Sequence, residues 1–383
     1  MQVNASLEQP DPSVAALFDP VMLGSLELRN RIVMAPMTRA FSPGGVPGAN
    51  VAKYYRRRAE GGVGLIITEG TWIGHPSASN DPNVPNFYGD EALAGWREVC
   101  RQVHSAGAKI VPQLWHVGAA AKSEVAEIYA EQVADETGRL GPSGLVKAGV
   151  EGGRAMIASE IEAIIEAYAD AAANAAALGF DGVEIHGAHG YLIDQFLWHE
   201  TNARSDGFGG DIAERTRFAA EIVRRIRSRT SPDFPIILRF SQWKMQDYGA
   251  RPWPTPEDLE TFLRPLVDAG VDIFHCSQRR YWDPEFAGSE LNLAGWTRKL
   301  SGKPTITVGS VTLSAEMIAT LMEGETATPR SIIDLVGRLE RQEFDLVAIG
   351  RALITNPDWP KVIASGCAGH LNPFSVGALA QLT

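Results

Sequence analysis

Short apolar runs alternate with longer amphipathic segments along most of this chain. The runs are almost continuously apolar, which is typical of parallel strands covered on both faces. They are RIVMAP (31–36), GLIIT (64–68), AKIVPQL (108–114), GVEIH (182–186), PIILRF (235–240), DIFHCS (272–277), PTITVG (304–309) and DLVAIG (345–350). Helical patterns lie between them, and several end in Gly just before the next strand, a C-cap signal. The clearest are EALAGWREVCRQVHSAG, IASEIEAIIEAYADAAANAAALG, IAERTRFAAEIVRRIRS, TPEDLETFLRPLVDAG and TLSAEMIATLMEGE.

This alternation predicts an α/β fold, a single closed (β/α)8 TIM barrel. The main alternative is a doubly wound open sheet, which is weakened because no GxGxxG follows the first strand. Since no repeat or linker is visible, we expect one domain over 1–383 with an N-terminal extension at 1–16. The long segment 117–153 follows the third strand, which predicts a cap or lid over the catalytic face. A polar insertion at 324–331 has no evident function.

Composition narrows the class of function. The chain has 383 residues and a net charge of -11, which argues against a general binder of nucleic acid or anionic membranes. Three scattered cysteines give no CxxC pair and fit a reducing compartment. The N-terminus lacks a signal peptide, and no apolar stretch is long enough to cross a bilayer. We therefore expect a soluble cytoplasmic protein, a monomer or homodimer, that acts on a small molecule.

Polar residues or glycines stand at the carboxyl end of the predicted strands, which is where barrel enzymes keep their chemistry. The candidates at these ends are Thr38 (with the apolar Pro36 and Met37 just before it), Gly70, Gln113, His186, Arg239, Gly309, Ser310, Gly350 and Arg351. The last four close the final two strands, where glycines let backbone N–H groups approach a phosphate. The alternative is that these glycines only make tight turns and that Arg351 is a solvated surface charge.

Arg239 stands at the end of a strongly apolar strand. A guanidinium in such a place needs an anionic partner, because an isolated buried charge is costly. That partner is either an anionic ligand group or a structural carboxylate, for which Glu184 on the preceding strand is the candidate.

The stretch VEIHGAHGYLIDQFL (183–197) places His186, His189 and Tyr191 within six positions. Two histidines at this spacing could bind zinc, but a catalytic zinc site wants a third protein ligand, and no HExxH helix or cysteine cluster is nearby. Alternatively, all three rings can donate hydrogen bonds to an organic substrate and protonate it. A purely structural role would be expected for any one of them alone.

Taken together, several motifs resemble the old yellow enzyme family of flavin-dependent ene reductases. They are LFDPVMLGSLELRNRIVMAPMTRA, TEG, QLWHVG, HGAHGYLIDQFL, NARSDGFGG with ERTRF, GSELNLA and DLVAIGRALITNPDWP, in this order from about Leu17 to Lys361. The resemblance implies a (β/α)8 barrel with FMN as cofactor and NADPH or NADH as hydride donor. It also implies ping-pong reduction of the activated C=C bond of α,β-unsaturated carbonyl compounds.

The resemblance also implies roles for the strand-end residues. Thr38 would hydrogen-bond the flavin C4 oxygen, Gln113 its pyrimidine edge, and Arg239 the region of N1. Pro36, Met37 and Gly70 would line the ring, and the phosphate pocket would comprise Gly309, Ser310, Gly350 and Arg351. No metal is implied.

For the substrate, the resemblance implies that His186 and His189 polarise the carbonyl oxygen, as donors do in an oxyanion hole. Tyr191 would donate a proton to the α-carbon. The sequence departs from the commonest family pattern from Ala119 onward and in FSQWKMQDY after Arg239.

Three other functions stay open at this point. One is a flavin-dependent amine dehydrogenase or demethylase on the same barrel. The others are a zinc-dependent hydrolase and a flavin-binding protein without turnover.

Overall fold

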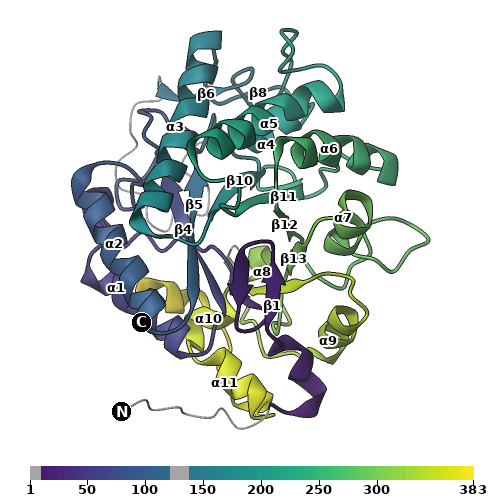
Figure 1. Ribbon diagram of the computed structural model, residues 1–383. Coiled ribbons are helices and arrows are strands. Elements are labelled where there is room, and N and C mark those ends of the chain that lie inside the picture. Colours follow the sequence, from purple (N-terminus) through teal and green to yellow (C-terminus); the bar gives the residue numbers. More distant parts are fainter. Residues whose placement is uncertain (1–9, 121–137, 322) are drawn as a thin grey trace.

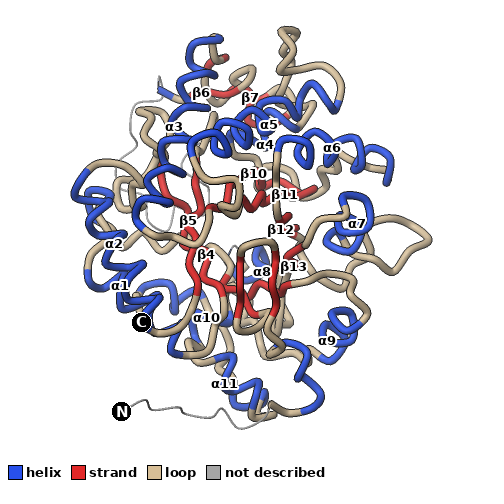
Figure 2. Tube along the Cα trace, in the orientation of Figure 1, coloured by secondary structure: helices blue, strands red, loops and turns tan. Residues whose placement is uncertain are grey.

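The computed structural model describes residues 10–120, 138–321 and 323–383. Eight parallel strands close a barrel in the order β10-β11-β12-β13-β14-β3-β4-β5, with helices around it (Figures 1 and 2). The strands are β3 (Ile32–Met34), β4 (Leu65–Trp72), β5 (Lys109–Trp115), β10 (Val183–His189), β11 (Ile236–Lys244), β12 (Ile273–Ser277), β13 (Thr305–Val308) and β14 (Leu346–Ile349). All eight predicted strands and the closed barrel are confirmed, and the doubly wound alternative is wrong.

The helices of the outer layer follow the strands in chain order. They are α1 (Ala49–Glu60), α2 (Asp90–Ser105), α3 (Ala158–Leu178), α4 (Leu192–Leu197), α5 (Ile212–Arg229), α6 (Pro256–Ala269), α7 (Leu293–Ser301), α8 (Met317–Leu321), α9 (Ile333–Glu340), α10 (Ala352–Thr355) and α11 (Trp359–Ala364). Short 3-10 turns add η1 (Pro12–Leu17), η2 (Pro43–Gly45), η5 (Ala368–His370) and η6 (Val376–Ala380).

The predicted glycine C-caps are confirmed at two helix ends, and one helix start carries a side-chain cap. The carboxylate of Asp211 accepts from the amide of Glu214, and the Glu214 side chain returns to Asp211, a capping box for α5. Gly179 and Gly270 end α3 and α6 in the left-handed conformation that glycine adopts without steric cost.

One predicted helix is largely wrong. Among its described residues, the segment TLSAEMIATLMEGE forms only the short helix α8; its first residue, Thr312, and Ser310 before it have φ angles of 60° and 48°. Those angles belong to a left-handed loop, so the chain cannot enter a right-handed helix until later.

An apolar plug fills the amino-terminal end of the barrel. The hairpin of β1 (Val21–Leu23) and β2 (Leu26–Leu28) lies across that end (Figure 1), and its buried leucines pack on the inward side chains of the barrel. Those side chains include Val33, Leu65, Val111, Ile237, Ile273, Ile306 and Leu346. Because this end is dry and apolar, polar chemistry is confined to the opposite, carboxyl-terminal mouth.

Two predicted peripheral segments are described in part. Residues 10 and 11 lead into η1, which contacts α9 and α11, while residues 1–9 lie outside the described residues. Of the 117–153 segment, residues 117–120 and 138–153 are described. They include β6 (Leu140–Gly141), β7 (Leu145–Lys147) and β8 (Val150–Glu151); β6 pairs with β9 (Arg154–Ala155) and β7 with β8.

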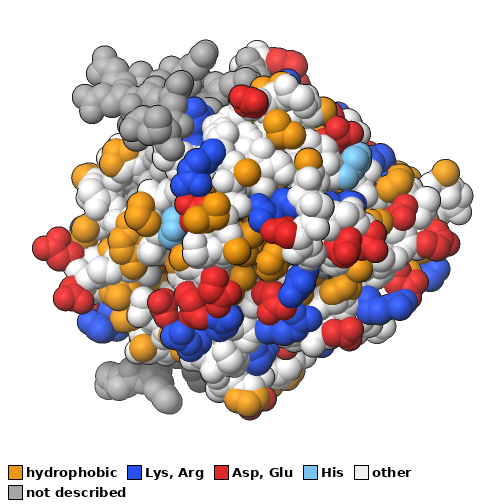
Figure 3. Space-filling view, turned by 90° about the horizontal axis from the view of Figure 1, so that it is seen from above, with side chains coloured by type: hydrophobic (Ala, Val, Ile, Leu, Met, Phe, Trp, Pro, Cys, Tyr) orange, Lys and Arg blue, Asp and Glu red, His pale blue; other side chains and the backbone are white. Residues whose placement is uncertain are grey.

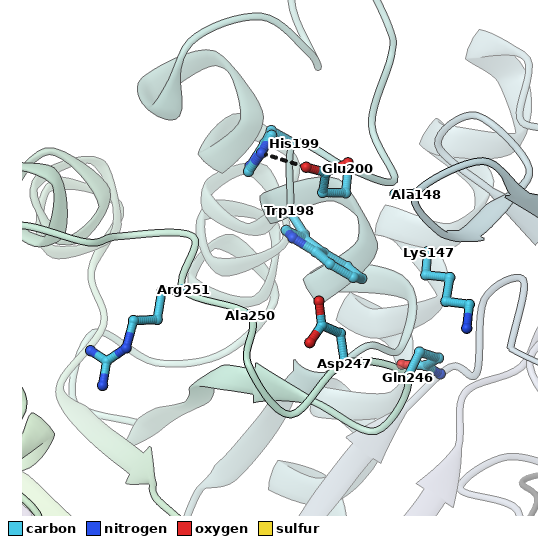
Figure 4. A pocket seen from close by; sticks show the side chains of 9 residues that line it. All are labelled: Lys147, Ala148, Trp198, His199, Glu200, Gln246, Asp247, Ala250 and Arg251. Atoms are coloured by element: carbon cyan, nitrogen blue, oxygen red, sulfur yellow. Dashed lines mark ion pairs between the residues drawn. The ribbon is translucent and has the colours of Figure 1, made fainter.

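The described part of this segment lies beside the end of α4. Lys147 and Ala148 line a depression of about 380 Å³ together with Trp198, Asp247 and their neighbours (Figure 4). His199 and Glu200 at its rim form an ion pair at 3.0 Å. The lid over the barrel mouth therefore stays a prediction, since residues 121–137 lie outside the described residues.

The 324–331 insertion has a structural partner. The backbones of Ala327 and Phe374 exchange two hydrogen bonds, at 3.0 and 2.9 Å, and Leu313 bridges Pro329. The insertion thus fastens the C-terminal tail to the loop after β13.

Acidic and basic side chains lie intermingled on the face shown in Figure 3. Within the described residues, no helix combines the length and apolar character needed to cross a bilayer.

Truncating Leu28 to Ala tests the plug. Leu28 is fully buried, so we expect the free energy of unfolding to fall by about 2–5 kcal/mol through lost burial and a residual cavity. Chemical denaturation measures this change, and cofactor content should stay the same because the plug is at the far end from the mouth. A loss below about 1 kcal/mol would show that the hairpin does not seal the barrel.

Candidate active site

A cavity of about 720 Å³ opens at the carboxyl ends of the barrel strands. Twelve of the thirteen strand-end and ring residues named from the sequence line it: Pro36, Met37, Thr38, Gln113, His186, His189, Tyr191, Arg239, Gly309, Ser310, Gly350 and Arg351. Their convergence from strands far apart in sequence is what the barrel interpretation predicts.

Gly70 is the exception, because it is buried behind Trp115 rather than lining the cavity. A Cβ atom on Gly70 would lie 2.4 Å from Cε3 of Trp115, so glycine is needed for the indole to approach. The indole in turn stacks on Trp72, with ring centroids 4.3 Å apart, and meets the ring of Tyr191 edge-on at 4.8 Å. Gly70 therefore shapes the cavity wall through Trp115.

The three rings of the HGAHGY motif converge on one part of the cavity. The rings of His186 and His189 are 5.2 Å apart and nearly perpendicular, and Tyr191 lies 5.2 Å from His186. Nε2 of His189 shares a 2.8 Å hydrogen bond with the hydroxyl of Ser277. Nδ1 of His186 is buried and has no hydrogen-bond partner in the described protein. This side chain therefore retains hydrogen-bonding capacity for a ligand.

Burial sets the protonation of these rings. It lowers the pKa of both histidines well below the usual value, and the positive charge of Arg239 lowers each further. Both imidazoles are therefore neutral near pH 7, each with one N–H to donate. Burial also raises the pKa of Tyr191 to about 12, so its hydroxyl stays protonated. The site can donate hydrogen bonds without carrying charge on these rings.

Arg239 is a buried charge of the cavity that forms no ion pair with a carboxylate among the described residues. Its side chain is buried, Nη2 donates to Ser277 Oγ at 3.4 Å, and Nε has no partner among the described residues. Glu184 does not serve it: one carboxylate oxygen accepts from Gln113 Nε2 at 2.8 Å and the other bonds His275 Nδ1 at 2.6 Å. The proposed structural ion pair between Arg239 and Glu184 is therefore not formed, which leaves an anionic ligand as the expected partner.

The ends of β13 and β14 lie side by side, as the anion-site interpretation requires. Gly309 has a φ angle of 151°, and a Cβ there would lie 2.7 Å from the carbonyl oxygen of Gln278, so only glycine fits. Arg351 is not a solvated surface charge. Its guanidinium donates to the carbonyl oxygens of Ala315 and Glu316 and to the hydroxyl of Thr320, which ties α8 to the cavity wall.

The parts of the wall that the sequence interpretation missed include the segment after Arg239 and the C-terminal tail. Trp243 stacks on His189 with centroids 4.4 Å apart, and Tyr248 stacks on Trp243 at 5.4 Å. Both lie in the segment after Arg239 whose departure from the family pattern was the only signal. The C-terminal tail contributes Phe374, Leu379 and Ala380, for which the sequence gave no local signal.

The zinc interpretation of HGAH gains no third ligand. Within the described ranges, His, Cys, Asp and Glu side chains form no group of three or more suited to hold a metal ion.

The fold and the cavity together define a barrel enzyme with a site for an anionic cofactor and a small-molecule substrate. The model of the NADH:flavin oxidoreductase / NADH oxidase family matches residues 16–369, so the chain belongs to this family, of the old yellow enzyme type. It is an FMN-dependent NAD(P)H oxidoreductase.

Two curated relatives illustrate the match. The chain is 40% identical over 361 residues to 12-oxophytodienoate reductase 7 of Oryza sativa subsp. japonica, covering 92% of this chain and 88% of the relative. It is 35% identical over 359 residues to an NADH oxidase of Thermoanaerobacter brockii, covering 91% of this chain. The match covers 51% of that oxidase, so this chain spans about half of its length.

Solved structures share the whole fold. Morphinone reductase in complex with tetrahydroNAD superposes with a TM-score of 0.76 at 29% identity, covering 95% of this chain and 94% of that one. The old yellow enzyme homologue from Zymomonas mobilis gives 0.76 at 25% identity, covering 96% and 97%.

His116, which follows β5, makes a pH-dependent contribution to stability. It is fully buried; Nδ1 accepts from the amide of Gly118 at 2.9 Å, and Nε2 lies 3.0 Å from Ser77 Oγ. Burial, with a smaller effect of His75, lowers its pKa to about 3. Below the ordinary histidine pKa the unfolded chain takes up a proton that the native state excludes, so stability falls as the pH falls.

We expect His116→Gln to reduce the acid sensitivity of the fold. Between pH 7 and pH 5 the native protein should lose about 2 kcal/mol of unfolding free energy through His116, a loss that the variant does not share. Urea unfolding at both pH values measures the difference. Equal losses in the two proteins would contradict the account of His116.

Proposed function

We propose that this enzyme reduces the activated C=C bond of α,β-unsaturated carbonyl compounds with NAD(P)H in a ping-pong reaction. The observation that carries the proposal is the convergence of His186, His189 and Tyr191 in the cavity that Arg239 enters. Two neutral imidazoles beside one protonated phenol provide the donors that an enolate-forming reaction needs.

The cavity fits FMN. The unpartnered Nε of Arg239 calls for an electron-rich group, and Gly309 and Gly350 line the cavity without side chains, which lets backbone N–H groups approach a phosphate. The residues that would hold the cofactor are Pro36, Met37, Thr38, Gln113, Arg239, Gly309, Ser310, Gly350 and Arg351. Within this set Thr38 is proposed to tune the cofactor through a hydrogen bond. When bound, FMN supplies hydride chemistry, accepting hydride from the nicotinamide and passing it to the alkene.

The histidine pair is proposed to bind the carbonyl oxygen of the substrate. Neutral N–H donors strengthen their hydrogen bonds as negative charge grows on that oxygen, so they stabilise the enolate more than the ground state. The hydrogen bond to Ser277 and the stacked indole of Trp243 fix the ring plane of His189. A carbonyl oxygen placed here would also withdraw electrons from the β-carbon, which prepares that carbon to receive hydride.

Tyr191 is proposed to protonate the α-carbon. Its raised pKa keeps the proton available at neutral pH, and an enolate carbon is basic enough to take it. The edge contact with Trp115 holds the phenol at the cavity wall. The names of the relatives support this proposal, since 12-oxophytodienoate reductase and morphinone reductase are both reductases.

Replacing Tyr191 by Phe separates the two half-reactions. In anaerobic stopped-flow experiments, bleaching of the yellow protein by NADPH or NADH should keep nearly its normal rate. Recovery of the colour with 2-cyclohexenone should slow by about 10²–10⁴-fold, because the general acid is lost while the ring remains.

Tyr248→Phe is the matched control. Tyr248 also lines the cavity, but its hydroxyl faces Met245 Sδ at 3.5 Å, so both half-reactions should be unchanged. Equal slowing of both half-reactions in Tyr191→Phe would contradict its role as proton donor. An unmodified protein that bleaches with nicotinamide and ignores enones would instead favour the amine-directed alternative.

A further inference from the structure

The turn that carries the substrate-binding rings has an unusual backbone. His189 and Gly190 have φ angles of 67° and 83°, so two consecutive residues are left-handed where β10 ends and the chain turns towards α4. For a histidine this conformation costs on the order of 1 kcal/mol or more and persists only where the surroundings enforce it. The turn must therefore be held by its neighbours.

Side chains or backbone from two elements bind all four polar backbone groups of this turn. The His189 amide donates to Ser241 Oγ in β11 at 3.0 Å, and its carbonyl accepts at 3.3 Å from the amide of Met245, the residue just after β11. The Gly190 amide donates to Asp194 Oδ2 at 2.7 Å, and its carbonyl accepts from Gln195 Nε2 at 2.8 Å, both in α4. The turn thus depends on how β11 and α4 are placed relative to each other.

One ion pair joins those two elements. Lys244 Nζ, at the end of β11, lies 2.5 Å from Asp194 Oδ1 in α4, and both side chains are 0% exposed. The same ammonium group donates to the carbonyl oxygen of Ser241 at 2.9 Å. One carboxylate oxygen of Asp194 therefore accepts from the Gly190 amide, and the other pairs with Lys244 of β11. Asp194 thus links the turn directly to β11.

We propose that Lys244 and Asp194 are positioning residues of the active site, whose buried ion pair clamps the 189–190 turn and so aims His189 and Tyr191 at the substrate. This inference rests on the proposed function and deepens it. Neither residue is needed to touch the substrate, because the pair acts through the turn.

The positioning role of the Lys244–Asp194 ion pair can be distinguished from a role in stability alone. Removing two charges from water carries a desolvation penalty that offsets much of the free energy gained from their attraction. Two well-packed neutral side chains often stabilise a protein core equally well. A pair that served only stability could therefore be replaced by neutral residues at little cost. A pair that serves position could not, because neutral side chains of the same size do not hold β11 and α4 together.

Two variants of the FMN-loaded protein test the proposal. Lys244→Met leaves Asp194 buried without its partner, and we expect a lower unfolding temperature together with an at least tenfold higher Kd for 2-cyclohexenone, measured by titrating the flavin absorption. In Lys244→Met/Asp194→Asn electroneutrality is restored, so thermal stability should recover while the Kd stays raised. Hydrogen exchange at the amides of His189 and Gly190 should be at least threefold faster in both variants.

Lys109→Met is the matched control. Lys109 pairs with Asp181 at 2.9 Å at the start of β5, the opposite end of the barrel, so its loss should leave the Kd and the exchange of the turn unchanged. The positioning role would be overturned if the double variant recovered ligand binding together with stability. Unchanged exchange at the turn in the double variant would overturn it equally, and that readout needs no substrate. Failure of the unmodified protein to bind cyclohexenone would instead refute the proposed function.

Discussion

The structure is organised around a buried guanidinium that forms no ion pair with a carboxylate of the described residues. Arg239 enters the barrel mouth from β11, and the nearest candidate anion, Glu184, is fully engaged by Gln113 and His275. The field of this charge keeps the neighbouring histidines neutral, in addition to the effect of burial. An anionic cofactor would neutralise the positive charge of Arg239. The same charge helps to keep His186 and His189 neutral, so that each can donate a hydrogen bond to a substrate.

The barrel places these groups through strand register. His186, Arg239 and His275 are paired neighbours on β10, β11 and β12, so parallel pairing alone brings the three side chains to one level. Below that level the interior is apolar and closed by the β1–β2 hairpin. The amino-terminal half of the barrel is therefore apolar and contributes to stability, whereas the polar residues that carry the chemistry lie at the carboxyl-terminal mouth.

Much of this arrangement is encoded locally. Continuous apolar runs predicted each barrel strand, and reading only the strand ends located the residues that line the cavity. Local sequence patterns did not predict the features that depend on contacts between residues far apart in the sequence. The left-handed residues Ser310 and Thr312 cut short a helix that the periodicity favoured. Arg351 binds the carbonyl groups of Ala315 and Glu316 just before α8, and the C-terminal tail reaches the cavity through Phe374. The approach of Trp115 to Gly70 likewise joins two strands and has no local signal, and the cofactor role of Gly70 stays a prediction.

The most direct test of the central claim is to replace Arg239 by Met and to measure the stability of the apoprotein and the Kd of FMN. If the guanidinium is there for an anionic cofactor, removing an unpaired buried charge should leave the apoprotein at least as stable as the unmodified one. FMN should then bind at least tenfold more weakly, a loss of about 1.4 kcal/mol or more. A destabilised apoprotein that binds FMN with unchanged affinity would show that Arg239 is a structural residue and would contradict the account.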